Sequence, residues 1–167
     1  MHRFDELVQR GAEFSLAAYR AASDGIAKES DTSGASRLVK ALQMLQLQKA
    51  VLAVGMFSIF EATVQDALGV EDGFQEVRRR LDASGNAALR ERFDDMFRAI
   101  NVLKHGKGRS YDALVAKAAA LPFTLKLPHE DFFSEGDVSE ATTLIEVDDA
   151  FVRNCAELIC DVTVATR

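Results

Sequence analysis

The sequence has few of the residues on which most catalytic and redox sites depend. Its 167 residues include two cysteines, two prolines, three histidines and no tryptophan. Cys155 and Cys160 are five residues apart, a spacing that fits neither a CxxC redox pair nor a zinc knuckle, so we expect two reduced core thiols. With only His2, His105 and His129, we expect no zinc or iron centre of several histidines within one chain, and no other cofactor.

Signals for secretion, membranes and common enzyme classes are also missing. The first segment, MHRFDELVQR, is charged rather than apolar, and we find no apolar run as long as a membrane span. We therefore predict a cytoplasmic protein with no membrane partner. The sequence contains no phosphate-binding glycine loop, HExxH motif or nucleophile elbow, which leaves metal-independent chemistry as the kind of catalysis to look for.

The composition indicates one helical domain spanning residues 1–167. Hydrophobic residues make up 48% and charged residues 28%, a profile typical of helices joined by short connections. The chain is long enough to bury a core without disulfides or a metal. Its net charge of -6 argues against a protein that coats nucleic acid by bulk electrostatics, so contact with RNA or DNA would need a local basic patch.

Apolar residues recur at helical spacing in six segments. The longest, Arg37 to Leu68, is predicted to be the central helix of an antiparallel bundle. The other predicted helices are Arg3 to about Ala22, closed by residues 23–25 and followed by a loop over 28–36; Phe74–Leu81; Ala87–His105, capped by Asn86; Ser110–Leu121; and a last helix capped by Asp148 or Asp149. Within the third of these helices, we expect Arg78, Arg79 and Arg80 to form a solvated face.

After Pro122 the pattern changes from helical to extended. The segments Phe123–Leu127 and Thr142–Val147 are rich in β-branched and apolar residues, and they flank a polar stretch that contains Pro128 and Gly136. We predict a small β-hairpin, or paired extended segments, before the last helix. The predicted fold class is therefore all-α, with a hairpin as a minor addition.

The stretch from Phe93 to Tyr111 carries the main candidate site. Arg98, Asn101 and His105 stand at positions i, i+3 and i+7, which places a guanidinium, an amide and an imidazole on one stripe away from the apolar face. Gly106 is then expected to end the helix. A local positive patch without an acid follows, made up of Lys104, Lys107 and Arg109.

These residue types could cleave RNA without a metal. An imidazole titrates near neutral pH and can remove a proton from a ribose 2′-hydroxyl, while a guanidinium holds the phosphate as charge builds on its oxygens. His105 would be the base, Arg98 the phosphate clamp and Asn101 an orienting donor. The cations of the patch would add positive potential for RNA binding.

A purely structural explanation of the same residues is also open. Cations in the last turn of a helix are favourable beside the negative end of its dipole, and Asp94 or Asp95 could pair with Arg98. On the long helix, Glu61 is either a surface carboxylate that pairs with Arg or Lys, or an auxiliary group that faces a partner.

The arrangement resembles the HEPN superfamily, small helical-bundle proteins whose signature is Arg, a usually polar residue, then His after four to six intervening residues. Arg98 and His105 enclose the six residues AINVLK, and FSIFEATVQDAL resembles the family's aromatic-Glu segment. INVLKHGKGRSYDAL is similar to HEPN-like proteins of bacterial defence and toxin–antitoxin systems. The resemblance implies a metal-independent endoribonuclease, a homodimer in which two such helices meet, and an antitoxin or another protein partner.

Other functions stay open beside this one. Ala99 follows Arg98 where the family usually has a polar residue, so the resemblance also fits a catalytically inactive RNA-binding or protein-interaction module. An enzyme acting on small molecules would need a pocket lined with polar groups, which the sequence does not define.

Overall fold

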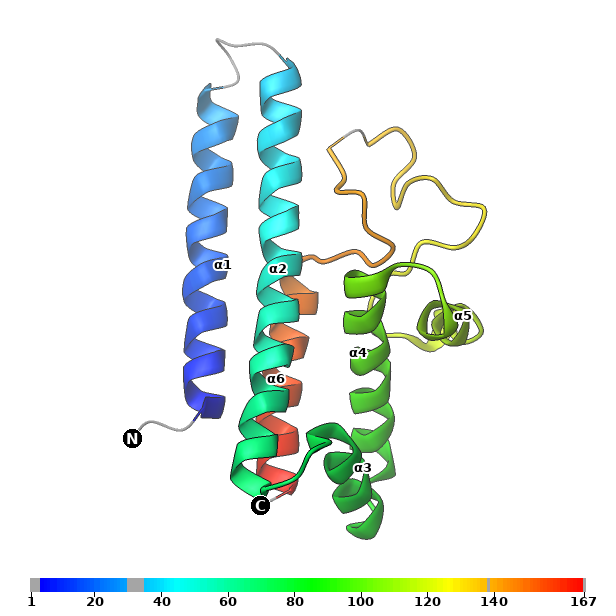
Figure 1. The fold of residues 1–167 in the computed structure, drawn as a ribbon. Coiled ribbons are helices and arrows are strands. Elements are labelled where there is room, and N and C mark those ends of the chain that lie inside the picture. Colours follow the sequence, from blue (N-terminus) through cyan, green and yellow to red (C-terminus); the bar gives the residue numbers. More distant parts are fainter. Residues whose placement is uncertain (1–3, 30–34, 138, 167) are drawn as a thin grey trace.

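The computed structural model describes residues 4–29, 35–137 and 139–166. Its helices form a bundle, which confirms the all-α prediction for this part of the chain (Figure 1). The elements are α1 (Phe4–Glu29), α2 (Ala35–Leu68), α3 (Gly73–Ala83), α4 (Ala87–His105), α5 (Arg109–Val115), the 3-10 helix η1 (Ala118–Ala120) and α6 (Asp149–Ala165).

Helices α1 and α4 run in the opposite direction to α2 and α6 (Figure 1). Side chains fix the antiparallel register of α1 and α6: the Glu13 carboxylate lies 2.8 Å from Nε of Arg153, and the Asp149 carboxylate lies 3.4 Å from Nε of Arg20. The C-terminal half of α1 and the N-terminal half of α2 extend beyond the start of α6 (Figure 1). The predicted long central helix is confirmed, and α2 contacts α1, α3, α4 and α6.

Two of the predicted helix caps are confirmed. The side chain of Asn86 accepts a hydrogen bond from the backbone N–H of Leu89 at 3.3 Å, and α4 starts directly after it. The Asp148 carboxylate accepts from the backbone N–H of Phe151 at 2.7 Å, at the start of α6. Such caps satisfy backbone donors that have no partner within the helix, and each contributes about 1 kcal/mol.

Two helix ends differ from the prediction. Helix α1 continues through the expected stop at residues 23–25 to Glu29, because one glycine costs a helix only about 1 kcal/mol and α1 packs along α2. The predicted loop over 28–36 is helical where the structure describes it, at 28–29 in α1 and at 35–36 in α2, and residues 30–34 lie outside the described ranges. At the other end of the chain, α5 stops at Val115 and the separate turn η1 follows, so residues 110–121 are not one helix.

The predicted β-hairpin is absent from the described part of the chain. The two extended segments meet in a single antiparallel bridge between Leu125 and Ile145, flanked by backbone hydrogen bonds of 2.9 and 3.1 Å. Both bridge residues are buried in the bundle core. The apolar, β-branched pattern therefore reflects two side chains that pack against helices, whereas the residues between the segments are held by side-chain contacts instead of a strand ladder.

Four buried phenylalanines form the centre of the bundle. Phe57 and Phe60 come from α2, Phe74 from α3 and Phe93 from α4. Five ring pairs among them have centroid distances between 5.0 and 6.2 Å. Edge and offset contacts at these distances add about 0.5–1.5 kcal/mol per pair beyond the burial of apolar area.

Helix α2 contains a longer apolar segment than predicted. Its segment Ser36–Leu68 is long and apolar enough to cross a membrane, judged by length and composition alone. Core helices of soluble proteins meet the same criterion, so the cytoplasmic location stays a prediction. Only 22% of the most apolar window of α2 is buried, and packing within the bundle therefore explains part of its apolar character but not all of it.

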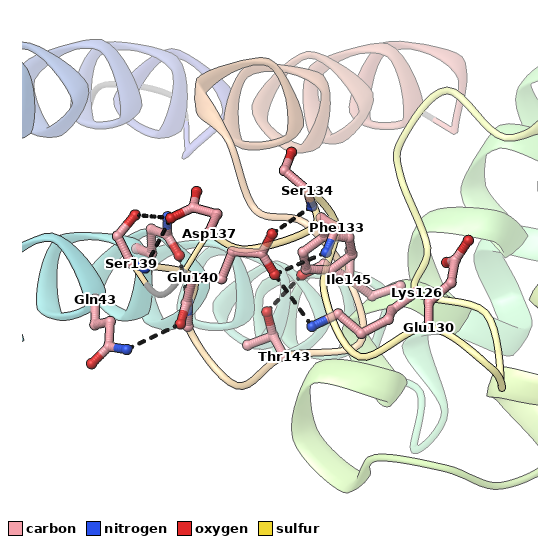
Figure 2. A network of polar contacts seen from close by, with 12 residues as sticks. Gln43, Lys126, Glu130, Phe133, Ser134, Asp137, Ser139, Glu140, Thr143 and Ile145 are labelled. Carbon is pink, nitrogen blue, oxygen red and sulfur yellow. Dashed lines mark hydrogen bonds and ion pairs between the residues drawn. The ribbon is translucent and has the colours of Figure 1, made fainter. Parts of the chain in front are cut away.

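Figure 2 shows a polar network that holds the segment before α6 against α2. The Glu140 carboxylate accepts hydrogen bonds from the backbone N–H groups of Phe133 at 2.9 Å and Ser134 at 2.6 Å. It also lies 3.5 Å from Nζ of Lys126, and both side chains are almost fully buried. The side chain of Gln43 in α2 donates to the Glu140 carbonyl at 3.4 Å. Glu140 therefore holds the segment together and also attaches it to the bundle.

Replacing this carboxylate should loosen the segment. We expect Glu140→Gln to lower the free energy of unfolding by about 2–3 kcal/mol, because hydrogen bonds to a charged group are lost and Lys126 keeps a buried charge. Urea unfolding measures the change. Glu135→Gln, at an exposed position of the same segment, is the matched control and should change little. Equal stability of Glu140→Gln and the parent would show that the network does not stabilise the fold.

Candidate functional site

Helix α4 places the predicted site residues at one end of the bundle. Its buried face, which includes Phe93, Met96 and Ile100, packs against α2, α3 and α6 and leaves the polar side outward. The helix ends at His105 as predicted. Gly106 has a φ of 74°, a conformation that favours glycine, and its N–H donates to the carbonyl four residues back at 2.8 Å.

Arg98 is half-buried and turned toward Asp95. The distance between Nη1 of Arg98 and Oδ1 of Asp95 is 3.4 Å, and the Asp95 side chain also binds Nζ of Lys117 at 2.8 Å. Hydrogen bonds to Asp95 and Glu91 raise the pKa of Lys117. The carboxylate of Asp94 instead binds arginines of α3 and α4. Asp95, one of the two acids proposed as structural partners of Arg98, therefore makes the contact, and Asp94 binds other arginines.

Glu61 lies beside Asn101 and Lys104, the single lysine of α4. A shallow depression between α2 and α4 is lined by Ser58, Glu61, Phe97, Asn101 and Lys104, among others. Its volume of about 10 Å³ is that of roughly one water molecule. The structure therefore brings Glu61, Asn101 and Lys104 together.

The predicted stripe on α4 is divided. Arg98 contacts Asp95, Asn101 borders the depression beside α2, and His105 is exposed at the end of the helix. Neither Arg98 nor His105 lines the depression, and no hydrogen bond or ion pair joins them within the described residues. One chain presents the expected groups at the same end of the bundle without assembling them into a cleft.

Four cationic or titratable side chains surround the end of α4. Lys104, His105, Lys107 and Arg109 are exposed, and none forms an ion pair with any residue that the structure describes. In contrast, carboxylates hold many other cations of the chain, including Arg78, Arg79, Arg80, Arg90, Arg92, Arg98, Lys117 and Arg153. We refer to the four exposed residues as the α4 basic patch, a local positive surface on an acidic chain.

The turn that carries the patch is fixed by Tyr111. Its hydroxyl donates to the carbonyl of Lys126 at 2.8 Å, its side chain is buried, and burial raises its pKa. Nζ of Lys107 lies 6.0 Å from the centre of the Tyr111 ring. The basic turn is therefore attached to the segment before α6 rather than projecting alone.

Arg78 was wrongly assigned to a solvated face. Its guanidinium lies 4.4 Å from the ring centre of Phe97 and its Nε is 2.8 Å from Asp94. Burial lowers its pKa, and the charges of Asp72 and Glu61 partly offset that effect. The sequence contained a signal for this position, because Arg78 falls within the helical repeat of the buried residues of α3.

Comparisons of the chain with profiles of known protein families, with curated proteins and with solved structures found no match. No group of three or more His, Cys, Asp or Glu side chains in the described ranges is placed to hold a metal ion. His2 lies outside these ranges. The α4 basic patch and its neighbours are therefore the features from which a function can be inferred.

Proposed function

We propose that this chain is a HEPN-like, metal-independent endoribonuclease that acts as a homodimer, in a toxin–antitoxin or defence system. The observation that supports RNA as the ligand is the α4 basic patch, whose side chains are exposed and free of ion pairs with described residues on a chain of net charge -6. A phosphate backbone is attracted by such a local patch in spite of the overall charge.

In the proposed reaction His105 takes the proton of a ribose 2′-hydroxyl. The 2′-oxygen attacks the adjacent phosphorus, the bond to the 5′-oxygen breaks, and the leaving oxygen takes up a proton from a second imidazolium or from water. Arg98 stabilises charge on the phosphate oxygens, for which it must turn from Asp95. The products are a 2′,3′-cyclic phosphate and a 5′-hydroxyl. A partner chain in the dimer would supply this second imidazolium.

RNA binding is tested by removing charge from the patch. The triple variant Lys104→Ala/Lys107→Ala/Arg109→Ala should bind single-stranded RNA about 10–100-fold more weakly. The slope of the logarithm of the binding constant against the logarithm of the salt concentration should become shallower by about 2, because each neutralised phosphate contributes roughly 0.7 to that slope. Arg10→Ala/Lys28→Ala removes two exposed cations of α1 and should bind like the parent. Filter binding at several salt concentrations measures both quantities. Unchanged binding by the triple variant would contradict the proposed surface.

Cleavage is tested with the parent chain in EDTA. We expect RNA to be cut into fragments with 2′,3′-cyclic phosphate ends, and DNA of the same sequence to stay intact because it lacks the 2′-hydroxyl. The contact of Arg98 with Asp95 supports a second candidate function, an RNA-binding module without catalysis. Binding of RNA without any cleavage would identify that module and exclude the nuclease.

A further inference from the structure

The outer face of α2 carries an apolar stripe, which the exposed side chains of Gln48 and Ser58 border. Opposite the buried face of this helix, exposed apolar side chains recur with helical spacing and share one side: Met44, Leu47, Val51, Ile59 and Ala62, with the half-buried Gly55 at the centre. In Figure 1, α6 passes behind α2, α1 and α4 lie on its two sides, and no ribbon of the described chain covers its near side. We call this surface the α2 stripe.

The α2 stripe ends in opposite charges. Lys40 precedes it by one turn and Asp66 follows it by one turn, and both side chains are exposed. Neither forms an ion pair with a residue in the described ranges. The stripe therefore carries a positive end, an apolar middle and a negative end.

Gly55 has no explanation within a single chain. A β-carbon at this position would meet no other atom within 4 Å, so neither a close contact nor the backbone conformation requires glycine there. Glycine in the middle of a helix costs about 1 kcal/mol relative to alanine. An outside surface that approaches the α2 backbone closely would account for it.

The stripe is complementary to itself in the antiparallel direction. With a two-fold axis at the height of the buried Ala53, Val51 of one copy faces Gly55 of the other, and a large side chain meets a small one. The same axis places Met44 opposite Ala62, a further pair of a large and a small side chain, Leu47 opposite Ile59, Gln48 opposite Ser58, and Lys40 opposite Asp66. A two-fold interface requires this reciprocity, since residue i meets residue j at both ends.

Helix α1 repeats the pattern next to α2. Leu7, Gly11, Phe14 and Ala18 share its outer side, and Phe14 is 78% exposed. Glu13 and Arg20 of α1 contact α6, so the four outer residues lie on the other flank of α1, next to the exposed face of α2. Around a centre between residues 12 and 13, Leu7 faces Ala18 and Gly11 faces Phe14, again large against small. A β-carbon at Gly11 would also meet nothing within 4 Å.

The two patterns can share one axis. Phe4 of α1 stacks on Phe60 of α2 at 6.4 Å, and Arg20 and Lys49 contact the same carboxylate of Asp149. The middle of the α1 pattern therefore lies at the height of the middle of the α2 stripe. We propose that two copies of this chain associate through these faces, with α2 antiparallel to α2 and α1 antiparallel to α1. The proposal does not depend on RNA cleavage.

The oligomeric state gives the first test. Light scattering after size-exclusion chromatography should give twice the mass of one chain. Val51→Glu, which alters only an exposed side chain of the monomer, should weaken association at least about 100-fold while the circular dichroism spectrum is unchanged. Val164→Glu is the matched control, because Val164 is an exposed apolar residue of α6 outside the stripe and its replacement should leave the dimer intact.

The charge pairing is tested by a swap. Lys40→Glu or Asp66→Lys alone should weaken association about 3–10-fold, since each creates two like-charge contacts in one dimer. The double variant Lys40→Glu/Asp66→Lys should restore the affinity of the parent. Failure of the double variant to recover would contradict the antiparallel register.

Cysteine crosslinking distinguishes this register from others. Residues 47 and 59 are about 18 Å apart along the helix at 1.5 Å per residue. Leu47→Cys copies mixed with Ile59→Cys copies should form a disulfide between chains, whereas each variant alone should not, because its two cysteines are too far apart. Crosslinking within either variant alone, or a monomer at micromolar concentration, would overturn the proposal. So would a monomer that floats with vesicles of phosphatidylcholine and phosphatidylglycerol, which would identify a lipid surface as the occupant.

Discussion

Cleavage of RNA by the His105→Ala variant should be about 10²–10⁴-fold slower than by the parent chain. This is the usual contribution of a positioned general base. Helix α4 has no second histidine that could take over this role. Arg98→Ala should slow the reaction about 10²–10³-fold, as expected for loss of one group that stabilises charge on the transition state. Rates measured in EDTA under single-turnover conditions separate these effects on chemistry from effects on RNA binding.

The matched control for the histidine is His129→Ala. His129 is exposed in the segment before α6, so its loss removes an imidazole without touching the α4 basic patch. We expect it to cleave like the parent. Added imidazole should restore part of the activity of His105→Ala and none of the activity of Arg98→Ala. If His105→Ala cleaves as fast as the parent, His105 is not the base and the proposed mechanism is wrong.

Phe93→Ala should lower the free energy of unfolding by about 3–5 kcal/mol, a large part of the 5–15 kcal/mol typical of a domain. The Phe93 ring is fully buried, with the rings of Phe57 and Phe74 at 5.9 and 5.2 Å. Its removal leaves a cavity at the junction of α2, α3 and α4. It also uncovers the guanidinium of Arg78, which lies 5.4 Å from the ring centre.

Urea unfolding followed by circular dichroism measures this loss. Phe132→Ala is the control: Phe132 is 42% exposed, so its truncation should change stability by less than about 1 kcal/mol. Similar losses in the two variants would mean that the phenylalanine cluster is not the main source of stability. Self-association of a protein raises its apparent stability, and both variants are therefore compared at one protein concentration.

Local signals in the sequence were sufficient for the main helices. The prediction for α4 gave its observed bounds, because Asn86 supplies a cap, Gly106 supplies the stop and apolar residues recur regularly between them. The long helix α2 was found for the same reason, as a repeat with no strong breaker over more than thirty residues. Such features depend on neighbours within a few residues in the chain, and the sequence displays those directly.

Contacts between distant segments were not predictable in the same way. The β-branched residues around Ile145 indicated a strand pair, but the segment is held by Glu140 and by Gln43 of α2, 97 residues earlier in the chain. The divided stripe on α4 has a similar cause. Helical spacing placed Arg98 and Asn101 on one side, whereas Asp95 and the neighbouring α2 decide where each side chain points.

Ser58 belongs to two surfaces at once. It borders the α2 stripe, and it lines the depression beside Asn101 and Lys104. Pairing through the stripe would therefore bring the α4 ends of both chains to the border of one interface. If a complete site needs both copies, the rate of RNA cleavage would rise with the square of protein concentration where the chain is mostly monomeric, and linearly where it is mostly dimeric. The kinetic order in protein would then report assembly without any physical measurement of mass.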